Sequence, residues 1–356
     1  MDNRTERRPA SQRNLVVGGM GFLLLTAAVF WWQFFRIGGG NAMPRWDELR
    51  WSYLVLALLC VPIETLACGL RIWVIARVLE PGVRLSTCIK AEWAQVAVST
   101  LTPTQSGGGP GQIYIMHREG TRVGTAVTIM LLSCLGTMIA LLCTGLFALV
   151  AGIKGSSHIL GAALLTSTGI AAVMVLLAIP PKAFPFRMRP ASALARVERL
   201  ARTLGNLLDA YRNDTAHFLR RGKAAFALVC ALSMTFILSR AVVAYLVVRF
   251  MGIDASTFRH ILEVQVVVLL VEFVAPTPGG AGIVEGASLA LMAAIVPPGH
   301  APHYNLLWRF ATLYLPALAG FVCLARALFL DARRVVRPDR SHRLEPSNAV
   351  SNRAWR

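Results

Sequence analysis

The stretch VEFVAPTPGGAGIVEG (residues 271–286) lies in an apolar region, yet it contains two carboxylates, two prolines and a glycine-rich turn. Proline removes a backbone hydrogen-bond donor and glycine weakens a helix, so both residues interrupt a membrane helix. Charged side chains at mid-membrane depth cost about 2.5–3.5 kcal/mol on insertion scales. The stretch therefore predicts a broken segment whose backbone and acids do something other than span the membrane.

The chain has too little charge for a soluble protein. Of its 356 residues, 55% are hydrophobic and 15% are charged, whereas soluble domains carry about 25% charged residues. Three runs without any charge, 15–35, 124–153 and 159–179, exceed the roughly 18–20 apolar residues that a helix needs to cross the hydrocarbon. The predicted fold class is an all-α polytopic membrane protein. About six full transmembrane helices are expected, at 15–35, 51–79, 124–152, 157–179, 224–250 and 303–330, the last with a kink at Pro316.

The formal net charge of +18 is concentrated in the N-terminal tail, in the segment 182–223 and in the C-terminal tail. Short positive segments mark the cytoplasmic side of membrane proteins. We therefore expect a multi-pass protein of the bacterial cytoplasmic membrane with both termini in the cytoplasm. Its basic tails are 1–14 and 331–356, around one membrane domain at 15–330. This placement explains the positive charge without a nucleic-acid partner.

The segment 180–223 is predicted to be a cytoplasmic linker with an amphipathic middle. Apolar residues from Leu194 to Tyr211 recur at steps of three and four, with arginines between them. This pattern suits a helix lying on an anionic leaflet. A solvated linker helix packed on the bundle fits equally well, and both alternatives stay open.

Each half of the chain contains a short apolar segment followed by a Pro/Gly cluster. The run 86–101 ends at TPTQSGGGPG (102–111), and the run 261–275 ends at PTPGGAG (276–282). Runs of about 15 residues reach only about 22 Å at 1.5 Å per residue, which is too short to span. The predicted topology enters the first from inside and the second from outside, as in an inverted repeat, and such paired interruptions indicate the central site of a transporter.

The two clusters are candidate ligand-binding backbone, because glycine lets amide groups approach a ligand and a helix N-terminus favours an anion. Simple hinges or close-packing sites are the alternative. The candidate residues in the clusters are Pro103, Gly107, Gly108, Gly109, Pro276, Pro278, Gly279, Gly280 and Gly282.

Three carboxylates lie too deep to reach the membrane surface: Glu64, Glu272 and Glu285. They should be paired, protonated or facing water, with Arg240 and Arg309 as candidate partners. Replacing Glu272 or Glu285 by Gln is expected to cost activity more than folding. We interpret Arg71 and Lys90 instead as snorkelling residues or structural ion pairs. The seven cysteines form no CxxC pair, so neither a metal nor a cofactor is expected.

The two clusters also resemble the motifs of a known family. PTPGGAGIVEG (276–286) is similar to the P-x-PGG-x-G-x-x-E-G signature of the flippase-like family named after the transmembrane region of lysylphosphatidylglycerol synthase. LTPTQSGGGPGQIYIMHREG (101–120) resembles its first-half motif, a proline and a Gly-rich turn followed by an apolar stretch and basic residues. The resemblance covers about residues 15–330 and implies lipid translocation, because in the two-domain synthases this region is regarded as moving aminoacylated phosphatidylglycerol between leaflets.

This chain departs from the synthases in its C-terminal part. It ends 26 residues after Leu330, too soon for the cytosolic aminoacyl-transfer domain, so a stand-alone member without synthase activity is expected. SGGGPGQ (106–112) also lacks the charged residue that many relatives carry beside the glycines.

The leading hypothesis is a flippase for an anionic lipid or a lipid-phosphate. The glycine-rich breaks would contact the phosphate, Arg240 or Arg309 would balance its charge, and Glu272 and Glu285 would tune or proton-couple the site. Two alternatives stay open: an integral-membrane transferase acting on a lipid-linked substrate, and a non-transporting scaffold for lipid or hopanoid biosynthesis. The expected partner is an anionic membrane lipid, with a homo-oligomer or biosynthetic enzymes as further partners left open.

Overall fold

The computed structural model describes residues 49–150, 157–179, 195–254 and 258–336, together with isolated positions between 24 and 35. The predicted helix 15–35 is not described as a whole, and the tails 1–14 and 337–356 lie outside the described residues. Every regular element in the described ranges is helical. The all-α fold class is therefore confirmed for this part of the chain.

Four helices in the described part are long and apolar enough to cross a membrane: Trp51–Leu79, Val123–Phe147, Lys223–Phe250 and Ala301–Asp331. They correspond to α2 (Trp51–Leu79), α5 (Val123–Val150), α8 (Lys223–Phe250) and the joined α11 (Ala301–Arg309) and α12 (Leu315–Val336). Four of the predicted spans are thus confirmed. A further predicted span, 157–179, is the helix α6 (Ser157–Ala178), of which Leu164–Ala178 is a shorter apolar segment.

The last span is irregular at the predicted place. A π-helical turn, η4 (Phe310–Tyr314), joins α11 to α12 directly before Pro316. Proline cannot donate to the carbonyl four residues earlier and its ring clashes with that carbonyl, and a π-turn is one way in which a helix absorbs such a break. The kink expected from Pro316 thus takes the form of a widened turn before it.

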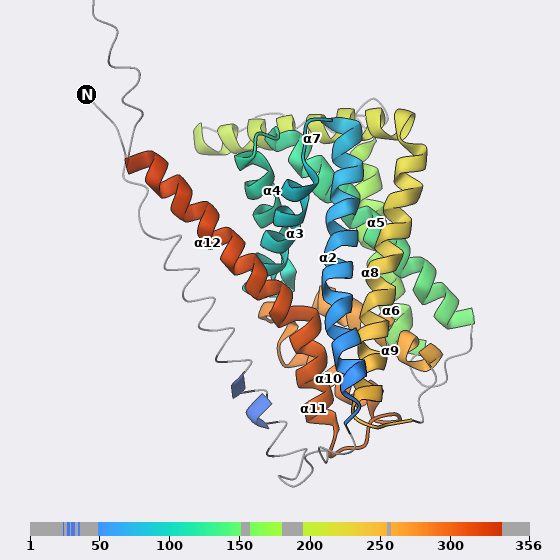
Figure 1. Ribbon diagram of the computed structural model, residues 1–356. Helices are drawn as coiled ribbons and strands as arrows, with labels where there is room; N and C mark the ends of the chain where they lie inside the picture. Colours follow the sequence, from blue (N-terminus) through green and yellow to red (C-terminus); the bar gives the residue numbers. More distant parts are fainter. Residues whose placement is uncertain are drawn as a thin grey trace, which may run out of the picture.

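The helix α7 (Ala195–Arg221) lies across one end of the long helices in Figure 1. Tyr211 and Phe218 are buried against the bundle, and the Tyr211 hydroxyl donates to the Met174 carbonyl at 2.9 Å. Leu204 and Leu219 are exposed. The amphipathic linker therefore packs on the bundle through one face and keeps other apolar side chains free of it.

Each half contains a helical pair too short to span, with a 3-10 turn between its helices. In the first half these are α3 (Leu85–Thr100), η2 (Pro103–Gln105) and α4 (Gly108–Arg118). In the second half they are α9 (Phe258–Val274), η3 (Pro278–Gly280) and α10 (Ile283–Met292). The lengths also match, at 16, 3 and 11 residues against 17, 3 and 10.

The two pairs enter the bundle from opposite ends. The Arg50 amide at the start of α2 donates to the Phe250 carbonyl at the end of α8, at 3.0 Å, so these helices run antiparallel. Because α3 follows the end of α2 and α9 follows the end of α8, the short pairs begin at opposite ends, as Figure 1 shows. Their tips meet: the Thr104 amide donates to the Ala275 carbonyl at 3.0 Å. This is the predicted inverted repeat.

The repeat extends to the backbone angles of the tips. Thr102 and Thr277 are both extended and both precede a proline that starts the turn. The next two residues have positive φ in each case, 53° and 55° at Thr104 and Gln105 and 59° and 72° at Gly279 and Gly280. Glycine adopts this region freely, whereas a β-branched residue there is a genuine outlier. The first tip therefore adopts, with backbone strain, the conformation that glycine allows in the second tip without strain.

Candidate functional site

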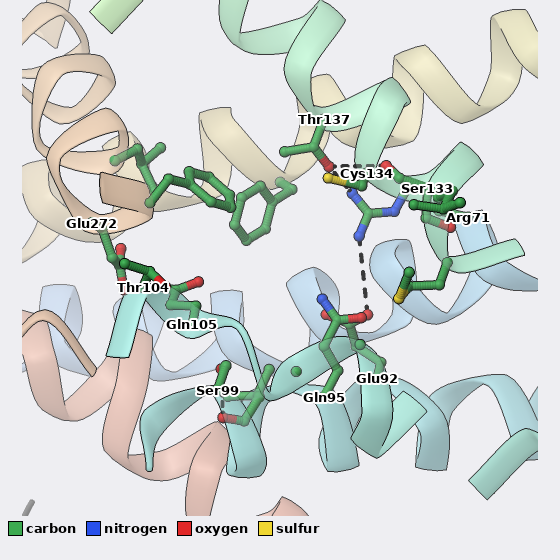
Figure 2. A pocket seen from close by; sticks show the side chains of 18 of the residues that line it. Arg71, Glu92, Gln95, Ser99, Thr104, Gln105, Ser133, Cys134, Thr137 and Glu272 are labelled. Carbon is green, nitrogen blue, oxygen red and sulfur yellow. Dashed lines mark hydrogen bonds and ion pairs between the residues drawn. The ribbon is translucent and has the colours of Figure 1, made fainter. Parts of the chain in front are cut away.

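A cavity of about 270 Å³ lies where the two tips meet. In Figure 2, Thr104, Gln105 and Glu272 lie on one side of it, and Arg71, Ser133, Cys134 and Thr137 lie on the other. Both halves contribute to the lining, and so do the central helices α2, α5 and α8. Its polar and charged lining residues are Arg71, Glu92, Gln95, Ser99, Thr104, Gln105, Ser133, Thr137, Arg240 and Glu272.

Arg71 provides one positive charge at the cavity. It is 5% exposed, and its Nη1 donates to Thr137 Oγ1 at 2.6 Å and to Ser233 Oγ at 3.4 Å. Its Nη2 lies 4.0 Å from Glu92 Oε2, while its Nε has no hydrogen-bond partner among the described residues. Arg71 is therefore buried and not snorkelling, in a structural ion pair that is long and leaves a donor unused.

Arg240 provides the second positive charge. Its Nε donates to Glu64 Oε1 at 3.0 Å, and the neighbouring Ser239 hydroxyl donates to the other oxygen of Glu64 at 2.7 Å. The Nη1 of Arg240 makes no hydrogen bond within the described ranges, and its guanidinium lies over the Phe236 ring at 5.1 Å. Glu64 thus fixes the orientation of the Arg240 guanidinium at the cavity.

The first tip forms a wall of the cavity. Thr104 and Gln105 line it together with Gly108 and Gly109, the first residues of α4. Thr104 is exposed although it lies where the two tips touch. A Cβ on Gly109 would meet the sulfur of Met130 on α5, so α4 packs against that side chain at this point. The strained backbone presents two polar side chains where the second tip has only glycine.

The polar groups of the second tip form hydrogen bonds with one another and with Arg309. Arg309 is fully buried, and its Nε donates to Glu285 Oε1 at 2.8 Å, its Nη1 to Glu272 Oε1 at 3.3 Å and its Nη2 to the Gly279 carbonyl at 3.2 Å. The other oxygen of Glu285 accepts from the Gly282 amide at 2.7 Å. The N-terminus of α10, which could hold an anion, is thus occupied by the chain's own carboxylate.

The predicted residues therefore divide into two groups. Gly108, Gly109, Arg240 and Glu272 line the cavity. The others do not line it. Glu64 orients Arg240, and Arg309 and Glu285 hold the second tip. The remaining tip residues outside the lining are Pro103, Gly107, Pro276, Pro278, Gly279, Gly280 and Gly282.

Sequence reasoning missed a larger set of lining residues. In the sequence Arg71 and Glu92 appear as isolated charges. They lie on two different helices, and the sequence does not show that these helices bring them together. Ser133 and Thr137 are spaced i, i+4 on a helix that is otherwise apolar, and this polar stripe was a usable signal. Lys90 lies 3.6 Å from Glu119, outside the cavity, in the structural ion pair that we expected.

The comparison with known proteins agrees with this architecture. Residues 19–320 match the family described as the lysylphosphatidylglycerol synthase TM region. The chain is also similar to a UPF0104 membrane protein of Archaeoglobus fulgidus, with 21% identity over 293 residues that cover 78% of this chain and 88% of that protein. With its inverted helical repeat and this match over most of its length, the chain belongs to the family of the lysylphosphatidylglycerol synthase TM region.

Proposed function

We propose that this protein moves an anionic lipid, or a lipid carrying a phosphate, between the leaflets of the cytoplasmic membrane. The observation that carries the proposal is the pair of buried guanidinium groups at one cavity. Arg71 and Arg240 both line it, and each keeps a nitrogen without a hydrogen-bond partner in the described part of the chain. Arginine matches the geometry of a phosphate, and charge-assisted hydrogen bonds are the strong ones.

The cavity suits a headgroup and not a whole lipid. At about 270 Å³ it is below the roughly 300–1,000 Å³ of pockets that enclose drug-sized ligands. Its apolar lining includes Met130, Met174, Phe236 and Phe273. A phosphate would contact the arginines and the polar side chains of the first tip, while the acyl chains stay in the hydrocarbon.

The inverted repeat supplies a way to move the headgroup. In transporters with this symmetry, one half rocks against the other around a fixed central site. Here the two halves meet at the tips through the bond from Thr104 to Ala275, next to the cavity. Exchanging the conformations of the two halves would open the cavity first to one leaflet and then to the other.

Leaflet transfer in vesicles tests the proposal. The purified protein is reconstituted with a fluorescent phosphatidylglycerol, and the fraction reached by a membrane-impermeant quencher is followed with time. Arg71→Gln and Arg240→Gln are expected to slow transfer by at least about 10-fold, since each removes a charge-assisted contact of roughly 1.5–3 kcal/mol. Arg77→Gln, on an exposed position of the same helix as Arg71, is the matched control and should transfer normally.

Two results would contradict this function. Wild-type protein that moves none of a panel of phosphate-bearing lipids would remove transport altogether. If both cavity variants behave as wild type, the arginines have no headgroup role, as a non-transporting scaffold predicts.

A further inference from the structure

Glu92 is the carboxylate with the weakest contacts at the cavity. It lies on α3, is 7% exposed, and faces Arg71 across 4.0 Å, as Figure 2 shows. This separation is too long for a hydrogen bond, and Oε2 of Glu92 has no hydrogen-bond partner among the described residues. A buried charge with one long ion pair keeps most of its desolvation cost.

The other buried carboxylates around the tips are held more tightly. Glu64 accepts from Arg240 at 3.0 Å and from Ser239 at 2.7 Å. Glu285 accepts from Arg309 at 2.8 Å and from the Gly282 amide at 2.7 Å, and Glu272 shares the same guanidinium at 3.3 Å. Glu92 is therefore the acid whose charge state can change with the least disturbance of the fold.

We propose that Glu92 binds a proton when the headgroup enters the cavity, an inference that rests on the proposed function. The lipid phosphate replaces Glu92 as the counter-ion of Arg71, and Glu92 becomes neutral. Before binding, Arg71 and an ionised Glu92 balance each other. After binding, Arg71 balances one negative charge of the phosphate. A carboxylate left unpaired in a low-dielectric site favours its protonated form.

The chemistry of the exchange is a single proton transfer. A hydronium ion from the solvent gives its proton to one oxygen of Glu92: one O–H bond of hydronium breaks, leaving water, as the O–H bond of the acid forms, and the proton returns to the solvent when the headgroup leaves. Arg71 stays in place because its Nη1 donates to the hydroxyl groups of Thr137 and Ser233, whereas a different nitrogen, Nη2, faces Glu92. One proton and one lipid charge therefore enter the site together and leave it together.

The groups around Glu92 are consistent with this exchange. Glu92 faces Arg71 directly and also lies within hydrogen-bonding reach of the Cys68 thiol on α2. The other titratable or charged groups near it are Glu64 on α2, Cys134 on α5, Arg240 on α8 and Glu272 on α9. The helices α4 and α12, which also pack on α3, bring Arg118 and Cys323, and these lie with Lys90 in a separate groove. Arg71 is thus the cation that pairs with Glu92, and whether Arg71 is bound to a headgroup sets the charge state of Glu92.

Proton counting tests the proposal without a variant. Short-chain dihexanoylphosphatidylglycerol is titrated into the detergent-solubilised protein in two buffers of different ionisation enthalpy, and the difference in heat gives the number of protons taken up. At a pH where Glu92 is ionised before binding, we expect uptake to approach one proton per lipid. By linkage, affinity should then fall by up to about 10-fold per pH unit as the pH rises.

A conservative pair of variants localises the effect. Glu92→Gln mimics the neutral acid, so it should bind the lipid without proton uptake and transfer it at a rate that does not depend on pH. Glu119→Gln, which alters an acid paired with Lys90 outside the cavity, should keep the pH profile of the wild type.

The results separate this inference from the proposed function. Lipid binding without proton uptake, or a Glu92→Gln variant that keeps the wild-type pH dependence, would overturn the role of Glu92 and leave transport intact. Loss of transfer at every pH in a folded Glu92→Gln variant would show that the charge itself is needed, which also overturns it. A wild-type protein that neither binds nor transfers the lipid would overturn both.

Discussion

Three buried arginines, Arg71, Arg240 and Arg309, differ in how completely the protein satisfies them. Arg309 is held by two carboxylates and a carbonyl, whereas Arg71 and Arg240 line the cavity and each have a buried nitrogen with no hydrogen-bond partner among the described residues. A fully hydrogen-bonded guanidinium stabilises the fold, and one with an unused donor is the better candidate for binding a ligand. At the scale of single residues, hydrogen bonding and not charge alone therefore separates Arg309 from the two arginines to which our proposal gives a binding role.

This difference changes the expectation for Glu285. Because Glu285 pairs with Arg309 and also accepts from the first amide of α10, Glu285→Gln should destabilise the fold. Breaking a buried pair by removing one partner costs about 3–5 kcal/mol. Thermal unfolding in detergent should show a large fall in midpoint, with Glu119→Gln as a control that shifts stability by about 1 kcal/mol or less. A Glu285→Gln variant of normal stability that loses only lipid transfer would contradict this prediction and support the expectation from the sequence, that the change costs activity more than folding.

At the scale of elements, the two tips are the same turn built from different residues. Both begin with an extended threonine and a proline, and both continue with two residues of positive φ. The first tip uses Thr104 and Gln105 where the second uses Gly279 and Gly280. Backbone strain of this kind costs about 1–3 kcal/mol per residue and is typical of functional sites. The cost fits a turn whose side chains must reach the cavity.

Exchanging residues between the tips tests this account. Thr104→Gly should leave the free energy of unfolding unchanged or raise it by about 1 kcal/mol, because the relief of strain exceeds the entropic cost of glycine. Gly279→Thr should lower it by about 1–3 kcal/mol, because it places a β-branched residue at φ 59°. Thermal unfolding of both variants provides the comparison. Clear destabilisation by Thr104→Gly would mean that contacts of the side chain, and not strain, dominate at this position.

At the scale of the whole molecule, the inverted repeat requires that the loops after α2 and after α8 lie on opposite sides of the membrane. In a cysteine-free background, Gly82→Cys should react with an impermeant maleimide only from the cytoplasm. Ile253→Cys should react only from outside. Labelling of intact cells and of inverted vesicles distinguishes the two sides. Reaction of both positions from the same side would contradict the topology.

Much of this architecture was predictable from the sequence. The long apolar runs located the long helices, and the Pro/Gly clusters located the two tips, because apolar length and backbone breaks are local properties. The partners of Glu272 and Glu285 were only partly predictable. Arg309 serves both, while Arg240 pairs with Glu64 across 176 residues. Arg71 and Glu92 were missed because the sequence does not show which faces of α2 and α3 meet.

The contact between the two tips includes a main-chain hydrogen bond, since the amide of residue 104 donates to the carbonyl of residue 275. No ordinary exchange of side chains deletes such a contact, and only proline at 104 would remove its donor. Side chains around this bond can therefore change while the bond itself persists. The main-chain bond between the tips therefore tolerates substitutions that change the side chains lining the cavity.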